Sequence, residues 1–210
     1  MAETRVVLDT CAVIQLRNST YNEFADKSLF QLSGDKKDLV EQRLGEKLRN
    51  WLTKGEEKLG WTICITKAAI MESEGEIKNM IERVAGRVKG RPDTVRYLLS
   101  NQTHRSLLYQ KCSGCSSVSE ERMTGIKKLI RSAYDKWEND ITRNCVTSYG
   151  VRNKSYDPEP QDIRRLAEAV ANKDDSSNRV IFLSKDGHFL CHIPTIDKEF
   201  RVEVIDYTKL

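Results

Sequence analysis

The sequence lacks several features that would assign it at once to a large class of proteins. No apolar run approaches the roughly 18 residues that a membrane-spanning helix needs, so we expect no membrane protein. The N-terminal segment has no basic stretch followed by a long apolar run, so we expect no signal peptide. No internal repeat or low-complexity tract occurs. The remaining classes are one large domain, or one compact domain with an insertion.

Glycine-rich phosphate-binding motifs are also missing. Neither GxGxxG nor GxxxxGK[ST] occurs, so the cradles of dinucleotide-binding proteins and of P-loop enzymes are absent. A haloacid-dehalogenase phosphatase needs an aspartate two positions after Asp9, and Cys11 stands there instead. A small-molecule phosphatase of another type stays open as an alternative.

Cysteine is present but without a clear framework. In a chain without a signal peptide, scattered cysteines predict reduced thiols and an intracellular, cytoplasmic location, with the nucleus as an alternative. Cys112 and Cys115 have the spacing of half a zinc site, but no second paired motif exists. We therefore expect a polar loop there and no zinc. The six cysteines are Cys11, Cys64, Cys112, Cys115, Cys145 and Cys191.

Positive charge is concentrated in the middle of the chain. The net charge is +4, but residues 78–156 hold 16 basic and 7 acidic residues, and the remainder is net negative. The same segment carries several tyrosines, and cations beside aromatic rings are typical of nucleic-acid binding. A solvated helical face with ordinary core aromatics is the alternative. The candidate RNA-binding residues are Arg83, Arg87, Lys89, Arg91, Lys127, Lys128 and Arg131.

Hydrophobic periodicity predicts alternating strands and helices. Short β-branched runs predict strands at 5–8, 61–65, 179–183 and 200–206. Helical spacing predicts helices at 36–59, from a Thr66 cap to 80 or beyond, and at 161–173, with a short helix opening at 12–16. In the middle, we expect a turn at 90–93, a loop at 112–119, and helices at 94–109 and 119–146.

This alternation predicts an α/β fold with a parallel sheet covered by helices on both faces. The long helical stretch between the second and third strands is too long for one simple crossover. We therefore expect a single domain over residues 1–210, with a basic, mainly helical insertion at about 81–156.

Four acidic residues stand where this fold would bring them to one edge of the sheet. Asp9 directly follows the first strand, and Asp186 lies three residues past the apolar run of the third. Ligands of open parallel sheets bind outside the carboxyl ends of the strands, where the following helices also begin. Glu72 lies about two turns into the helix after the second strand, and Asp162 lies in the first turn of the next predicted helix.

Converging carboxylates repel one another and recruit a cation. Oxygen ligands suit Mg²⁺ or Mn²⁺, which can bind a phosphodiester and activate water. Each acid taken singly also has a structural interpretation, for example as a helix-start acid favoured by the helix dipole. If the helix register differs, the acids that would replace Asp162 are Asp140, Asp157 and Glu159.

Four motifs around these acids resemble the PIN-domain family of metal-dependent ribonucleases. They are VVLDT at 6–10, ITKAAIME at 65–72, DIRRLAEAVA at 162–171 and VIFLSKDGHF at 180–189. Each motif is weak alone, but the four occur in the family's order. The resemblance covers roughly residues 4–80 and 157–208.

The resemblance implies a three-layer α/β/α fold in which the four acids bind one or two Mg²⁺ or Mn²⁺ ions. Water would then attack the phosphodiester and leave 5′-phosphate and 3′-hydroxyl ends. Thr10 and Ser184 would orient the metal ligands or the water. His188 stands where some members carry a further aspartate, and an ordinary hydrogen-bonded histidine is the commoner interpretation of it.

Our hypothesis is a metal-dependent endoribonuclease of RNA processing or decay whose basic insertion selects the RNA. The length of the insertion favours this over a toxin-type PIN ribonuclease. A catalytically inactive RNA-binding scaffold in a larger RNA-processing complex is the main alternative, and a domain that binds an acidic protein partner is a more distant one. A homodimer is compatible with the sequence, which identifies no dimer face.

Overall fold

The computed structural model describes residues 3–20, 36–87, 115, 118–137, 158–173 and 178–210. One four-stranded sheet lies at its centre, and all its strand pairs are parallel. The strand order β2-β1-β3-β4 places the first strand in the interior of the sheet. The predicted α/β fold with a parallel sheet is confirmed. The strands are β1 (Thr4–Leu8), β2 (Thr62–Cys64), β3 (Arg179–Ser184) and β4 (Val202–Asp206).

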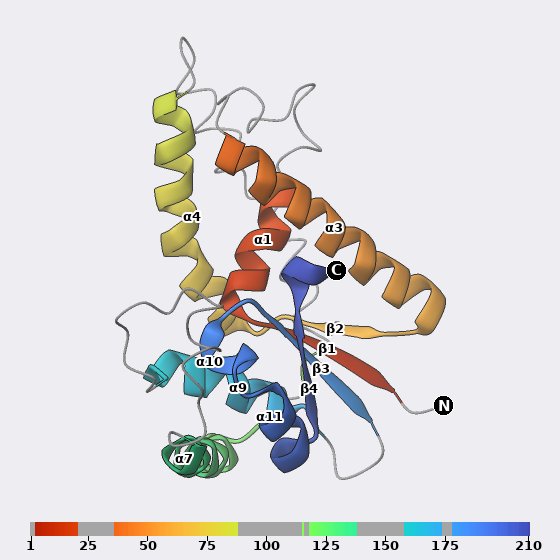
Figure 1. Cartoon of the computed structure of the whole chain (residues 1–210), viewed down its shortest axis with the longest axis vertical. Helices are drawn as coiled ribbons and strands as arrows, with labels where there is room; N and C mark the ends of the chain where they lie inside the picture. The colour runs from red at the N-terminus through yellow and green to blue at the C-terminus, as the bar shows by residue number, and fades with distance from the viewer. Residues whose placement is uncertain (1–2, 21–35, 88–114, 116–117, 138–157, 174–177) are drawn as a thin grey trace.

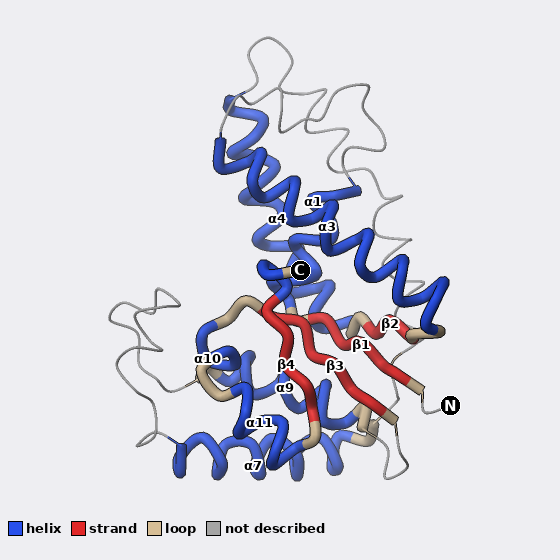
Figure 2. Tube along the Cα trace, turned by 45° about the vertical axis from the view of Figure 1, so that its right-hand side comes forward, coloured by secondary structure: helices blue, strands red, loops and turns tan. Residues whose placement is uncertain are grey.

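Helices cover both faces of the sheet (Figures 1 and 2). One face carries α1 (Thr10–Thr20), α3 (Lys36–Leu59) and α4 (Lys67–Arg87). The other carries α7 (Glu120–Trp137), α9 (Pro160–Ala171) and α11 (Ile193–Phe200). Two short helices, α10 (Gly187–Leu190) and η2 (Tyr207–Lys209), follow β3 and β4. Among the described helices, none has the length and apolar character needed to cross a lipid bilayer.

The strands are apolar on both sides, and this divides the core into two clusters. Val6 and Leu8 of β1 pack with α1, α3 and α4, whereas Val7 between them packs with α7 and α9. The same alternation separates Ile181 from Phe182 in β3. A sheet buried on both faces needs continuous apolar strands, which explains why the strand signals are short apolar runs.

Helix starts and ends follow local signals in the sequence. The Thr66 hydroxyl accepts a hydrogen bond from the Ala69 backbone N–H at 3.1 Å and so caps α4, as predicted. Pro160 occupies the first turn of α9, where a missing N–H costs nothing. The Asp162 carboxylate accepts from the Glu159 backbone N–H at 2.9 Å in the same turn.

Part of the predicted insertion belongs to the core. The helix α7 lies inside the 81–156 segment, and its buried face packs against α9 and the sheet. Helix α4 extends to Arg87, so the first residues of the segment continue that helix. The expected turn at 90–93 and helix at 94–109 lie outside the described residues. The buried residues of α7 are Ile130, Ala133, Tyr134 and Trp137.

The cysteines correct one sequence prediction. Cys64 of β2 forms a disulfide with Cys115, and Cys191 is also disulfide-bonded. The prediction of reduced thiols is therefore wrong for these three cysteines. Cys11 is a free cysteine. The sulfur of Cys115 is therefore not a free thiolate for zinc. Spacing could not reveal this bond because its partners are 51 residues apart. Disulfides are rare in the cytosol, so this bond counts against the cytoplasmic location, which stays a prediction.

Candidate metal and phosphodiester site

The four predicted acids lie at the carboxyl edge of the sheet. Asp9 follows β1 directly, and Asp186 lies two residues after the end of β3. Glu72 is in the second turn of α4, the helix that follows β2. Asp162 is in the first turn of α9, which runs back along the sheet toward the start of β3. Other residues link these acids. Thr10 contacts both Asp9 and Glu72, and His188 contacts both Asp162 and Asp186. Ser184 links the two pairs.

Asp9 is the buried acid of the site. Its side chain accepts hydrogen bonds from the Ser184 hydroxyl at 2.6 Å, from the Cys11 thiol at 3.0 Å and from the Thr10 backbone N–H at 2.7 Å. Burial raises the pKa of Asp9, and Asp186 raises it further, while these donors oppose the shift. Asp9 is therefore held in one orientation by residues from the ends of two neighbouring strands.

Ser184 connects Asp9 to Asp186. Its hydroxyl donates to Asp9 and accepts from the Asp186 backbone N–H at 3.0 Å. The Cys11 sulfur likewise accepts from the Lys185 backbone N–H at 3.4 Å. These contacts hold the loop after β3 against the loop after β1. Thr10 and Ser184 thus both contact an acid of the site, as expected for residues that orient it, although their role in catalysis stays a prediction.

Asp162, Asp186 and His188 form a group that could hold a metal ion. One ligand atom from each lies within 4.8 Å of the other two. His188 Nδ1 is 2.9 Å from Asp186 Oδ1 and 3.5 Å from Asp162 Oδ2, so the imidazole lies between the two carboxylates. The group contains neither Asp9 nor Glu72.

The charges of this edge are strongly coupled. The pKa of Asp162 is raised to about 6, first by burial and then by repulsion from Asp186, with a further contribution from Asp9. The Glu159 backbone N–H and His188 oppose the shift. Burial is thus the main cause of the raised pKa of Asp162, and the two neighbouring aspartates add to it.

Glu72 has a different environment from the other three acids. Its Oε2 accepts from the Thr10 hydroxyl at 2.9 Å and pairs with Arg165 Nε at 3.1 Å. Arg165 is 5% exposed and also pairs with Glu168, which is 9% exposed. Glu72 thus reaches the rest of the site through Thr10, and a buried arginine offsets its charge.

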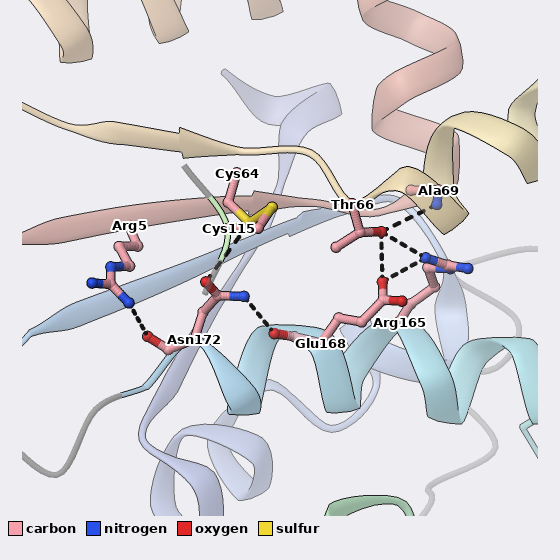
Figure 3. Close-up of a disulfide and its surroundings, with 8 residues drawn as sticks. All are labelled: Arg5, Cys64, Thr66, Ala69, Cys115, Arg165, Glu168 and Asn172. Atoms are coloured by element: carbon pink, nitrogen blue, oxygen red, sulfur yellow. Dashed lines mark hydrogen bonds and ion pairs between the residues drawn. A yellow bond between two sulfur atoms is a disulfide. The ribbon is translucent and has the colours of Figure 1, made fainter. Parts of the chain in front are cut away.

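A buried polar network surrounds that arginine. Figure 3 shows Arg165, Glu168 and Thr66 joined by hydrogen bonds over α9, near the disulfide. The Thr66 hydroxyl donates to Glu168 Oε2 at 2.7 Å and accepts from Arg165 Nη1 at 2.9 Å. Each charge in this network has a partner of opposite sign or a hydroxyl, which is the condition for burying it.

Helix α7 anchors the short helix α10, which carries His188. The Tyr134 hydroxyl donates to the His188 backbone carbonyl at 2.9 Å. Burial raises the pKa of Tyr134, and the charges of Asp162 and Asp186 raise it further. The phenol therefore stays a hydrogen-bond donor at neutral pH.

The predicted RNA-binding residues fall into two groups. Lys127, Lys128 and Arg131 are on α7, where Lys128 and Arg131 are exposed and Lys127 is half-buried. Arg83 and Arg87 belong to the last turns of α4, where the structure does not describe the side chains. Lys89 and Arg91 lie outside the described residues.

Sequence reasoning missed two contributors to this site. Arg165 carried no signal in a single sequence, because an arginine between the apolar positions of an amphipathic helix is normally exposed. The sequence signal for His188 is its position two residues after Asp186. That signal alone favours an ordinary hydrogen-bonded histidine. Of the acids that could have replaced Asp162, Glu159 is exposed, and Asp140 and Asp157 lie outside the described residues.

Comparisons of this chain with protein-family models, with curated proteins and with solved structures find no match. The PIN resemblance therefore depends on the four motifs and their order, and it stays a prediction. What the chain shows by itself is a parallel α/β fold with a coupled acidic edge.

The raised pKa of Asp162 predicts a specific pH dependence of stability. The folded pKa of about 6 exceeds the ordinary value of 3.8, so the folded protein binds more protons between these pH values. The free energy of unfolding contributed by this group therefore falls as pH rises from about 4 to about 6, and it stays low above that. Asp162→Asn removes this loss and keeps an oxygen to accept the Glu159 N–H.

We expect Asp162→Asn to be more stable than the wild type at pH 7.5 in EDTA, by on the order of 2 kcal/mol. The difference should shrink toward zero near pH 4. Urea denaturation of both proteins from pH 4 to pH 8 measures it. A stability difference that does not change with pH would contradict the assigned pKa.

Proposed function

We propose that this protein is a metal-dependent ribonuclease of the PIN type that hydrolyses RNA phosphodiesters in RNA processing or decay. The observation that supports this best is the group formed by Asp162, Asp186 and His188, with ligand atoms within 4.8 Å of one another. The group lies at the sheet edge where parallel α/β proteins bind their ligands. Asp9 is linked to this group through the Ser184 hydroxyl.

The donor set fits a divalent cation. Two carboxylates supply hard oxygen ligands, and one imidazole supplies a nitrogen, a combination that suits Mn²⁺ better than Mg²⁺. Burial is the main cause of the raised pKa of Asp162, and the charge of Asp186 adds to it; a cation bound here would relieve that repulsion. Asp162, Asp186 and His188 would hold the ion, and Asp9 would add negative potential beside it.

The residues around the ion would then have distinct roles. A divalent ion held at this edge would supply Lewis-acid activation of a phosphate oxygen and of water. Asp9 is held in one orientation by Ser184 and Cys11, so its charge does not have to reorganise when substrate binds. The Tyr134 hydroxyl fixes the backbone of His188. Thr10 ties Glu72 to the same edge.

A cleavage assay tests the proposal. We expect single-stranded RNA labelled at its 5′ end to be cut in Mn²⁺, to remain intact in EDTA, and to be cut again when Mn²⁺ is restored. The products should carry 5′-phosphate and 3′-hydroxyl ends, which ligation and phosphatase treatment report. Cleavage that continues in EDTA, or products with 2′,3′-cyclic phosphates, would contradict the proposal.

One observation favours the alternative of an RNA-binding scaffold without activity. The Oε2 atom of Glu72 is already engaged by Thr10 and by Arg165. If Glu72 must bind a metal for turnover, this pairing opposes it. The same assay decides, because a scaffold would bind the RNA and leave it intact in Mn²⁺.

A further inference from the structure

A cavity of about 690 Å³ lies between α7 and the start of α9. Its volume is within the range of small-molecule sites in proteins. Helix α7 lines one side of the cavity, and residues 158–159 with the first turn of α9 line the other. The residues that define its chemistry are Lys127, Lys128, Arg131, Pro158, Glu159 and Ile163.

The cavity combines an apolar wall with cations. Pro158 and Ile163 are buried at one side. Lys127 and Lys128 are adjacent on α7, and neither makes an ion pair with the described part of the chain. Arg131 lies one turn further along and donates to the Pro158 carbonyl at 3.3 Å, which ties α7 to the segment before α9. The lining also includes one acidic residue, Glu159, against the three cationic residues Lys127, Lys128 and Arg131. An anion beside the two lysines would therefore meet an excess of positive charge.

The cavity adjoins the acidic edge. Pro160 and Ile163 line it, and Asp162 lies between them in the first turn of α9. Consecutive helical residues rise by only about 1.5 Å, so one turn of α9 contributes to both features. Helix α7 likewise contributes to both: Lys127 lines the cavity, and Tyr134 contacts the backbone of His188 in α10.

We infer that this cavity is a subsite for one nucleotide of the RNA, next to the phosphodiester held at the acidic edge. The inference rests on the proposed ribonuclease function. The base or ribose would lie against Pro158 and Ile163, and a phosphate would lie at Lys127 and Lys128. A nucleotide fits better than an acidic peptide because it joins a flat, largely apolar group to an anion within one residue.

The test compares two double variants of the same helix. Lys127→Gln with Lys128→Gln removes the cations of the cavity. Arg122→Gln with Lys136→Gln removes the same charge from two exposed residues of α7 that do not line it. Binding of a fluorescein-labelled single-stranded RNA is measured by anisotropy in EDTA, so that cleavage cannot affect the readout. Thermal unfolding confirms that both variants fold.

We expect the cavity variant to bind the RNA at least 10-fold more weakly. The slope of log affinity against log salt should become shallower by about 0.7, because the protein no longer neutralises the phosphate at the two lysines. The control variant should stay within about 3-fold of the wild type. Equal losses in both variants, or wild-type affinity in the cavity variant, would overturn the inference.

Competition identifies the ligand class. We expect unlabelled RNA to displace the labelled RNA at far lower concentration than polyglutamate of matched charge. Polyglutamate that competes equally well would overturn the inference in favour of an acidic protein partner. RNA binding is measured without metal, so it is independent of cleavage. If the cavity variant binds RNA more weakly but the wild type never cleaves RNA, the subsite is supported and the ribonuclease function is refuted.

Discussion

Asp186→Asn is expected to reduce Mn²⁺-dependent RNA cleavage by about 100-fold or more while the protein stays folded. The variant removes one negative charge from the group with Asp162 and His188. It keeps the Oδ1 atom, which accepts from the His188 backbone N–H at 2.8 Å, so the start of α10 keeps its cap. Cleavage rates and Mn²⁺ affinity by calorimetry measure the effect.

Asp197→Asn is the matched control, because Asp197 is exposed on α11 and belongs to no acidic group of the site. It should cleave RNA at the wild-type rate. RNA affinity in EDTA should be unchanged or slightly stronger in Asp186→Asn, since a negative charge is gone. An Asp186→Asn protein that binds Mn²⁺ and cleaves RNA like the wild type would show that the site lies elsewhere.

Asp9→Asn is a less informative variant. The Oδ2 atom of Asp9 accepts from both Ser184 and Cys11, and the Oδ1 atom accepts from the Thr10 N–H. An amide nitrogen in either position would place a donor against a donor inside the core. A loss of cleavage in that variant would combine a change in chemistry with a loss of stability.

Arg165→Met is expected to lower the free energy of unfolding by about 3–5 kcal/mol. Arg165 is 5% exposed and pairs with Glu168, which is 9% exposed, and with Glu72. Removing the cation leaves the buried carboxylate of Glu168 with only the half-exposed Arg164 as a counter-charge, although methionine fills much of the volume. Urea denaturation at neutral pH measures the change.

The neighbouring Arg164→Met provides the control. Arg164 also pairs with Glu168, at 3.3 Å, but half of its side chain is exposed, and an exposed i,i+4 pair contributes about 0.5 kcal/mol or less. Adding Glu168→Gln to Arg165→Met should recover at least about 1 kcal/mol, because the unpaired charge is removed. Similar losses in the two arginine variants would refute a special role for Arg165.

Local patterns determined the framework of this protein. The first three strands were predicted from short apolar runs, because a strand buried on both faces is largely apolar. The edge strand β4 instead alternates buried and half-buried residues. The helix at 36–59 and the Thr66 cap were likewise local signals, and both agree with the structure. The acids after β1 and β3 could be placed because the carboxyl ends of parallel strands meet at one edge.

Tertiary structure decided the contacts between distant segments. The Cys64 disulfide, the burial of Arg165 and the position of His188 between two carboxylates each join residues that periodicity does not relate. The short helices after β3, α10 and α11, were not predicted either, since their few residues show too little repetition. Sequence periodicity indicates which side of a helix or strand is buried. Which residues contact one another depends on how the helices and strands pack. That packing brings the charged side chains together at the acidic edge.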